Sequence, residues 1–258
     1  MPRRPLYASI SGKGGTGKTV LTALLLRVLL DELTNDEILV VDADPATNLP
    51  QALGIPVNKT IGDVAEEFRR EFQKFDSYGF EKSALLEYYI ARDCIVEAEK
   101  FDFIAMGRGE GEGCYCYVNA LLSGILGKLI QHYSVVLMDM EAGLEHLNRR
   151  LDRHLNTFII VVDNSLMSLK TAEKIKEIIR EVGLKADEVY VVGNRLTSRR
   201  EEAVVGWASQ IGLKYAGTIP EDRNVAEYTA NGMPLLNLPR DSEALKAACN
   251  VARYINLV

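Results

Sequence analysis

A short segment, residues 11–19, combines three residue types that bind phosphate groups: glycine, lysine and a hydroxyl side chain. It reads Ser-Gly-Lys-Gly-Gly-Thr-Gly-Lys-Thr and fits the phosphate-loop pattern of Gly, four residues, Gly, Lys and then Ser or Thr. Glycines let successive backbone amides turn toward phosphate oxygens, because no side chain stands in the way. The nucleotide-binding residues that we expect in this segment are Gly12, Lys13, Gly14, Gly15, Thr16, Gly17, Lys18, Thr19 and Val20.

The residues around this segment supply the structural context that the pattern requires. Residues 6–10 predict a short buried strand, and residues 20–33 predict a helix. A helix that begins near Lys18 points the positive end of its dipole at the bound phosphates. We expect Lys18 to reach the β- and γ-phosphates and Thr19 to offer its hydroxyl to Mg²⁺.

Aspartates follow two further apolar runs. Asp42 and Asp44 come after residues 38–41, and Asp139 comes after residues 135–138. An aspartate at the end of a buried strand is where phosphate-loop ATPases keep a carboxylate for Mg²⁺, so Asp139 is a magnesium candidate. Asp42 and Asp44 also suit a metal and a water molecule. They suit a helix-capping turn equally well, because Asp before Pro is a common helix start.

Cys114 and Cys116 form a second candidate site, for a soft metal. Two thiolates one residue apart can chelate a single divalent ion, although the pair also fits buried small side chains or a redox pair. The preceding residues 109–113 alternate glycine with glutamate, which argues against burial. Two ligands leave a Ni²⁺ or Zn²⁺ site half filled, and a twofold dimer would supply the other two. Cys94 and Cys249 stand alone in helical context and are interpreted as core residues.

Strand-like and helix-like runs alternate along the chain and must position these residues. We predict strands at 6–10, 38–41, 101–106, 135–138, 158–162, 189–192 and 215–219, and helices at 20–33, 118–131, 169–182 and 242–255. Residues 58–100 are helical in pattern, and Phe68, Phe72 and Phe75 form a core stripe. This alternation predicts an α/β fold, a doubly wound, mostly parallel sheet with helices on both faces. At 258 residues, the chain fits a single domain over 1–258.

The phosphate loop carries a second lysine, Lys13, and this feature resembles the deviant phosphate loop of the MinD/ParA group of ATPases. The resemblance covers nearly the whole chain, and it implies a phosphate-loop NTPase fold that binds ATP and Mg²⁺. It implies that Lys13 crosses a homodimer interface to the phosphates of the other subunit. It also implies that Asp44 orients the attacking water and that Asp42 lies nearer the Mg²⁺. The expected catalytic residues are then Lys13, Lys18 and Asp44.

Two further turns follow strands and resemble the adenine-binding positions of the same group. They are Asn194 with Arg195, and Pro220 with Glu221 and Asp222. Ordinary turn chemistry also accounts for Asn, Pro and Asp at such places. With the phosphate loop present, the resemblance implies that these residues hold the adenine. It implies more weakly that Asn48 approaches the γ-phosphate.

Residues 139–146 read Asp-Met-Glu-Ala-Gly-Leu-Glu-His, and together with the Cys-x-Cys pair they resemble one branch, the CooC-type ATPases. These assist nickel insertion into carbon monoxide dehydrogenase. The resemblance implies a homodimer, dependent on nucleotide or metal, that binds Ni²⁺ or Zn²⁺ through Cys114 and Cys116. It also implies a nickel-enzyme client, either carbon monoxide dehydrogenase or acetyl-CoA synthase.

Composition bears on the alternatives from other classes. The formal net charge of −6 argues against bulk nucleic-acid binding, and the terminal helix has only Lys246 and Arg253 as cations, which disfavours a MinD/ParA-like positioning role at a membrane. An Mrp-like iron–sulfur scaffold would carry Cys-x-x-Cys near the C-terminus, where this chain has only Cys249. With no signal-peptide pattern, no long apolar run and four cysteines, we expect a cytoplasmic protein.

Overall fold

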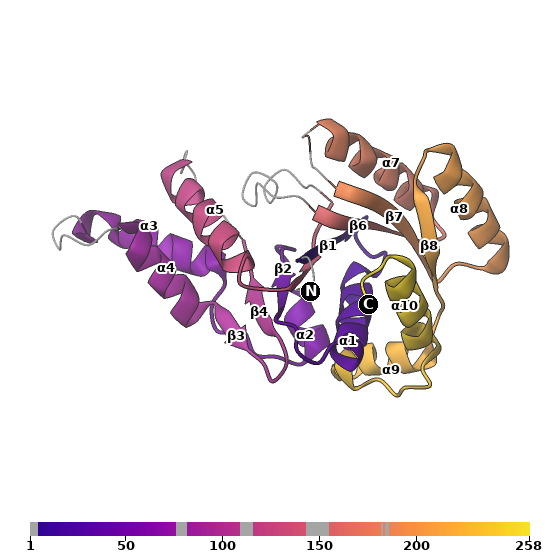
Figure 1. The fold of residues 1–258 in the computed structure, drawn as a ribbon, viewed down its shortest axis with the longest axis horizontal. Coiled ribbons are helices and arrows are strands. Elements are labelled where there is room, and N and C mark those ends of the chain that lie inside the picture. The colour runs from indigo at the N-terminus through magenta and orange to yellow at the C-terminus, as the bar shows by residue number, and fades with distance from the viewer. Residues whose placement is uncertain (1–4, 76–81, 109–115, 143–154, 182, 184–185) are drawn as a thin grey trace.

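A computed structural model describes residues 5–75, 82–108, 116–142, 155–181, 183 and 186–258. Its centre is a sheet with strand order β3-β4-β2-β5-β1-β6-β7-β8 (Figure 1). The strands are β1 Leu6–Gly12, β2 Ile38–Asp42, β3 Ile95–Glu97, β4 Asp102–Ala105, β5 Val135–Asp139, β6 Leu155–Val162, β7 Ala186–Asn194 and β8 Lys214–Ile219. All neighbours pair in parallel except β3 and β4, which are antiparallel.

Helices cover both faces of this sheet, as the alternating pattern predicted. They are α1 Lys18–Glu32, α2 Leu49–Leu53, α3 Ile61–Phe75, α4 Lys82–Asp93, α5 Cys116–Ile130, α7 Leu166–Glu181, α8 Ser198–Gln210, α9 Arg223–Ala230, the 3₁₀ helix η2 Leu235–Asn237, and α10 Glu243–Tyr254. One buried apolar cluster joins the sheet to α3, α4, α5, α7 and α8, and a second joins it to α1, α2, η2 and α10. The predicted doubly wound, mostly parallel fold is confirmed.

Two central strands explain how the core is built. Every residue of β2 and of β5 is buried, which is typical of parallel strands covered on both faces. Their ends are aligned, so that Asp42 of β2 lies opposite Asp139 of β5. The fold therefore brings together two carboxylates that lie far apart in the sequence.

The segment 58–100 was only partly predicted. It forms α3 and α4, but it also contains β3, a three-residue edge strand that is only partly buried. Phe68 is buried as predicted, whereas the side chains of Phe72 and Phe75 lie outside the description. Cys94 is buried, and Cys249 is half-buried against the α1–α10 cluster, in agreement with their interpretation as core residues.

The other edge of the sheet is irregular. The register between β7 and β8 shifts at Val191 and Val192, where Tyr215 and Gly217 are the successive partners. Gly217 has a φ of 135°, a backbone conformation that favours glycine. Within the described residues, no helix is long and apolar enough to cross a membrane.

Candidate functional site

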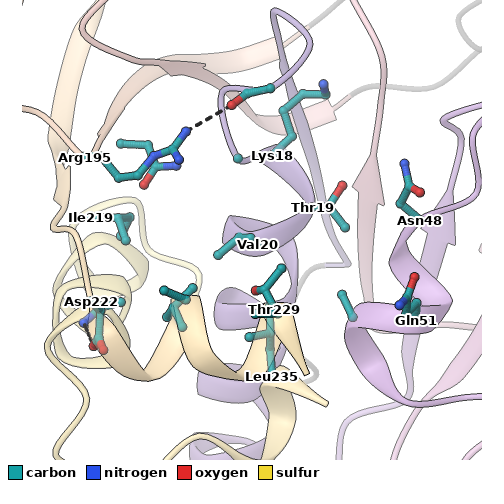
Figure 2. A pocket seen from close by; sticks show the side chains of 18 of the residues that line it. Lys18, Thr19, Val20, Asn48, Gln51, Arg195, Ile219, Asp222, Thr229 and Leu235 are labelled. Carbon is teal, nitrogen blue, oxygen red and sulfur yellow. Dashed lines mark hydrogen bonds between the residues drawn. The ribbon is translucent and has the colours of Figure 1, made fainter. Parts of the chain in front are cut away.

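A cavity of about 900 Å³ opens at the carboxyl ends of β1, β2, β7 and β8, beside the first turn of α1. This volume falls within the usual range for small-ligand pockets. Figure 2 shows α1 between Arg195 on one side and Asn48 and Gln51 on the other. The predicted site residues that line the cavity are Gly14, Gly15, Gly17, Lys18, Thr19, Val20, Asp44, Asn48, Asn194, Arg195, Pro220, Glu221 and Asp222.

The phosphate loop holds its backbone amides free. Among the described residues, the amides of Gly14, Gly15 and Gly17 have no hydrogen-bond acceptor. Gly15 and Gly17 have φ values of 82° and 92°, and a Cβ at Gly17 would lie 2.1 Å from Asn194 Nδ2. Only glycine fits such a position. Free amides that open onto a cavity beside a helix N-terminus form a site for anions, which agrees with the predicted phosphate loop.

Lys18 and Thr19 begin α1, next to the carboxylate of Asp139. Lys18 is 6% exposed, so its ammonium reaches the cavity from a largely buried stem. The Thr19 hydroxyl donates to Asp139 Oδ2 at 2.7 Å. Asp139 Oδ1 is buried and has no hydrogen-bond partner among the described residues. A buried carboxylate oxygen without a partner fits a cation, and the hydroxyl beside it is a second oxygen ligand.

Asp42 holds the backbone next to the cavity without lining the cavity itself. It is fully buried, and its two carboxylate oxygens accept hydrogen bonds from the amides of Asp44, at 3.0 Å, and Leu49, at 3.1 Å. Burial and the neighbouring charge of Asp139 raise the pKa of Asp42 from 3.8 to about 7. Asp42 therefore shapes the turn that carries Asp44 and the start of α2.

Asp44 lies on the cavity wall with part of its carboxylate available. Its Oδ1 accepts from the amide of Ala46 at 2.9 Å, and its carbonyl accepts from the amide of Thr47 at 2.9 Å. No hydrogen bond within the described chain engages its Oδ2. The side chain is thus fixed at one oxygen, while the other can accept a hydrogen bond from a water molecule.

Lys13 does not line the cavity of its own chain. Its ammonium lies 3.5 Å from the Gly14 carbonyl. It also lies close enough to Asp163, at the end of β6, to affect that carboxyl. Burial acts to raise the pKa of Asp163, but hydrogen bonds from Ser165 and Ser168 and the Lys13 charge hold it below its ordinary value. The predicted contact of Lys13 with a second subunit stays a prediction.

The two turns predicted to hold adenine have further roles in the fold. Asn194 Nδ2 donates to the Thr16 carbonyl at 2.7 Å, and the Arg195 guanidinium donates to the Gly15 carbonyl at 3.1 Å, a bond drawn in Figure 2. Asp222 Oδ1 accepts from the Asn224 amide at 2.7 Å, which caps α9. These residues lie at the cavity, and their contact with a base stays a prediction.

The second oxygen of Asp222 joins α9 to α10. Asp222 Oδ2 accepts from the Ser242 hydroxyl at 2.7 Å and from the Ala244 amide at 3.0 Å. Burial acts to raise the pKa of Asp222, but these hydrogen bonds outweigh it and hold the pKa below its ordinary value. Asp222 therefore positions the helix that walls the cavity.

Sequence reasoning missed several residues that line the cavity. Glu141 adds a carboxylate after β5, Gln51 comes from α2, and the apolar wall consists of Ile219, Val225, Ala226, Met233 and Leu235. The signal for α9 was present, because Asp222 followed by a helix-forming run is a common N-terminal cap. Leu235 comes from η2, and no local pattern indicates that it contacts this wall.

The proposed soft-metal site falls largely outside the described residues. Cys114 is outside them, and Cys116 begins α5 with a side chain that is not described. Residues 143–154, which include the end of the 139–146 motif, are also outside. Within the described part of the chain, no group of three or more His, Cys, Asp and Glu side chains could hold a metal ion. Mg²⁺ bound with a nucleotide needs fewer, because phosphates and water supply the other ligands.

Comparison with known proteins agrees with this geometry. The sequence matches the family described as the CobQ/CobB/MinD/ParA nucleotide binding domain over residues 7–235. It is 41% identical over 251 residues to an ATP-binding protein of Methanocaldococcus jannaschii described as uncharacterized, covering 97% of this chain and 98% of that protein. It is 28% identical over 241 residues to the carbon monoxide dehydrogenase accessory protein CooC of Rhodospirillum rubrum, covering 89% of each.

A solved structure shows the same fold. It is the septum site-determining protein MinD of Pyrococcus horikoshii, complexed with Mg-ADP. The two chains superimpose with a TM-score of 0.66 at 22% identity, over 96% of this chain and 94% of the other.

Proposed function

The chain belongs to the CobQ/CobB/MinD/ParA nucleotide-binding family, and from that premise we propose that it hydrolyses ATP and uses the cycle to deliver a soft metal ion. The observation that carries the ATPase is the set of groups around one cavity. The free loop amides, Lys18, Thr19 and Asp44 line this cavity, and the Thr19 hydroxyl donates to Asp139, whose other oxygen has no partner among the described residues. These groups suit the phosphate end of a nucleotide.

Each residue has a distinct part in the proposed reaction. The amides of Gly14, Gly15 and Gly17 bind the phosphate oxygens, and Lys18 neutralises charge on the β- and γ-phosphates. Asp44 accepts a hydrogen bond from the attacking water through its free oxygen and so orients it toward phosphorus. Because little covalent chemistry falls to the protein in phosphoryl transfer, positioning and electrostatics provide most of the rate.

Asp139 and Thr19 are the residues that would hold Mg²⁺ in this site. Their fit rests on the buried Asp139 Oδ1 without a partner and on the adjacent hydroxyl. When bound with the nucleotide, the ion neutralises charge that develops on the phosphate oxygens. Asp42 has a different role in this proposal, because its carboxylate accepts from the Asp44 amide and so holds the backbone of the turn that carries Asp44.

The dimer in this proposal rests on Lys13, which does not line the cavity of its own chain. If Lys13 completes the site of a second copy, ATPase activity per chain must rise with protein concentration. We expect this rise in wild-type protein over a dilution series, and we expect Lys13→Ala to hydrolyse slowly at every concentration. ATP-dependent dimerisation is checked by light scattering. Activity per chain that is independent of concentration, at equal saturation with Mg-ATP, would overturn the shared site.

The metal-carrying part of the proposal rests on the Cys114/Cys116 pair and on the similarity to CooC. Two chains would supply four thiolates to one Ni²⁺ or Zn²⁺ at the twofold axis. The client would be a nickel enzyme, namely carbon monoxide dehydrogenase or acetyl-CoA synthase. Because nucleotide and metal would both favour the same dimer, each would raise the affinity for the other.

The test is metal stoichiometry under anaerobic conditions, with and without Mg-ATP. We expect one metal ion per dimer in wild-type protein and none in the Cys114→Ser, Cys116→Ser double variant. Cys249→Ser, on α10, is the matched control and should keep the metal. ATP-driven dimerisation without specific metal would remove the delivery role and leave a positioning or signalling ATPase, as in the MinD/ParA relatives.

A further inference from the structure

The phosphate loop is held in shape by hydrogen bonds to its carbonyl groups. The Lys13 carbonyl accepts from the Thr16 hydroxyl at 2.8 Å, and the Gly17 carbonyl accepts from the Leu21 amide at 2.9 Å. Among the described residues, the donors to the Gly15 and Thr16 carbonyls come from the turn after β7, namely Arg195 and Asn194. These two bonds tie the loop to a strand that is distant in the sequence, and the Gly15–Thr16 peptide is also held through the Thr16 amide, which donates to the Lys13 carbonyl at 3.3 Å.

The backbone of Arg195 is itself fixed by two hydrogen bonds. Its amide donates to the Ile219 carbonyl of β8 at 2.8 Å. Its carbonyl accepts from Asn164 Nδ2, in the turn after β6, at 2.7 Å. Its φ is 55°, a left-handed conformation that is uncommon for a side chain other than glycine or asparagine. Such a conformation persists only where the surrounding structure determines it. The fixed backbone of Arg195 therefore sets the direction in which its side chain leaves the turn.

We propose that Arg195 is a positioning residue for the phosphate end of the nucleotide and that Asn164 positions Arg195. The guanidinium fixes the Gly15–Thr16 peptide, whose amide donates to the Lys13 carbonyl at 3.3 Å, and so holds the loop in the conformation that leaves the amides of Gly14, Gly15 and Gly17 free for phosphates. This role differs from the adenine contact that the family resemblance implies for the same residue. It rests on the proposed function, because it concerns the same loop and the same ligand.

The two roles predict different losses. A residue that contacts the base changes the affinity for ATP and its ratio to GTP, and it leaves the binding of a bare triphosphate chain unchanged. A residue that directs the loop amides changes the affinity for ATP, GTP and tripolyphosphate by one common factor. Charge alone also affects every anion, so a variant that keeps the charge is needed. Asn164→Ala serves this purpose, because Asn164 is uncharged and does not line the cavity.

The experiment is calorimetric titration of Mg-ATP, Mg-GTP and magnesium tripolyphosphate into four proteins. They are wild type, Arg195→Gln, Asn164→Ala and Arg199→Gln, the last an exposed arginine on α8 outside the cavity. We expect Arg195→Gln to weaken all three ligands about three- to tenfold, the usual net effect of losing one hydrogen bond. Asn164→Ala should weaken them by a common factor of about two to five, and Arg199→Gln should bind as wild type.

The possible results separate this inference from the proposed function. If the wild-type protein does not bind Mg-ATP, the proposed function itself is overturned. Wild-type binding with unchanged tripolyphosphate affinity in Arg195→Gln overturns the positioning role, and a changed ATP to GTP ratio then assigns Arg195 to the base. If Arg195→Gln fails to fold, as seen by circular dichroism, Asn164→Ala decides: unchanged affinity for tripolyphosphate overturns the inference, and a common loss supports it.

Discussion

Asp44→Asn is expected to lower the rate of ATP hydrolysis by about 10² to 10³ while it leaves ATP affinity within about threefold of wild type. Asparagine keeps the oxygen that accepts from the Ala46 amide, so the turn keeps its shape. It replaces the free carboxylate oxygen with an amide group that donates instead of accepting. The attacking water then loses its acceptor, whereas the phosphate loop and Lys18 are unchanged.

Single-turnover hydrolysis separates this loss from binding, and equilibrium titration with a non-hydrolysable nucleotide measures the affinity. Glu141→Gln is the informative comparison, because Glu141 also brings a carboxylate to the cavity. If Glu141→Gln loses more activity than Asp44→Asn, the water-orienting role belongs to Glu141. If the proposed dimer forms with ATP, Asp44→Asn should trap it, so light scattering should show a larger dimer fraction than in wild type.

Asp139→Asn is expected to make the protein without Mg²⁺ more stable at pH 8 and to abolish the magnesium dependence of ATP binding. Burial raises the pKa of Asp139 from 3.8 to about 6, although the hydrogen bond from Thr19 and the Lys18 charge act against this rise. A carboxyl whose folded pKa lies above its unfolded pKa holds its proton more tightly when folded. Its ionisation therefore opposes folding, and stability falls as pH rises from about 4 to about 6.

The size of this effect follows from the pKa difference. A pKa difference of about two units corresponds to a loss of about 3 kcal/mol in the free energy of unfolding. This loss is complete at pH 8 and absent below pH 4. Asp42, with a pKa of about 7, extends the same fall in stability to about pH 7. Asparagine at position 139 removes the buried charge, and we expect it to raise the free energy of unfolding at pH 8 by about 1 to 3 kcal/mol.

Urea unfolding at pH 8 and at pH 4 measures this difference, with Glu202→Gln as a control that removes an exposed carboxylate. The gain should appear at pH 8 only. Equal stability of Asp139→Asn and wild type at pH 8 would falsify the account of a buried, unpaired carboxylate. In wild-type protein, Mg-ATP should restore stability at pH 8, and in the variant ATP should bind equally with and without Mg²⁺.

The sequence predicted best those features that depend on short contiguous patterns. The phosphate loop was recognisable because its residues lie side by side in the chain, and Asp42 and Asp139 because each directly follows an apolar strand. Strand β3 was missed because three partly buried residues carry too little periodicity to detect. The bounds of β6 and β7 were set too short, because polar residues interrupt the apolar pattern near their starts, Asn156 and Thr157 in β6 and Asp187 and Glu188 in β7.

The sequence did not reveal which polar groups pair through hydrogen bonds across the fold. Asp222 was predicted to lie at a base, and its oxygens also accept from Asn224, Ser242 and Ala244, the last two of which nothing local predicts. Arg195 was predicted beside Asn194 at a base, and its guanidinium also donates to the Gly15 carbonyl, which no local pattern indicates. Such pairings arise when strands far apart in the sequence lie together, so they become visible only in three dimensions.

The two edge strands of the sheet determine how readily another copy of the protein could add a strand to it. An outer strand with a free row of amides and carbonyls is a template for strand addition, which leads to fibres. Here one margin is β3, three residues long and reversed in direction, and the other is β8, whose register is interrupted near Gly217. Both are poor templates, because a short strand and a bulge each break the continuous ladder that an added strand would need. The proposed cycle would bring two copies together repeatedly. The edge strands β3 and β8 then disfavour the growth of open-ended polymers, so that association is limited to a twofold dimer.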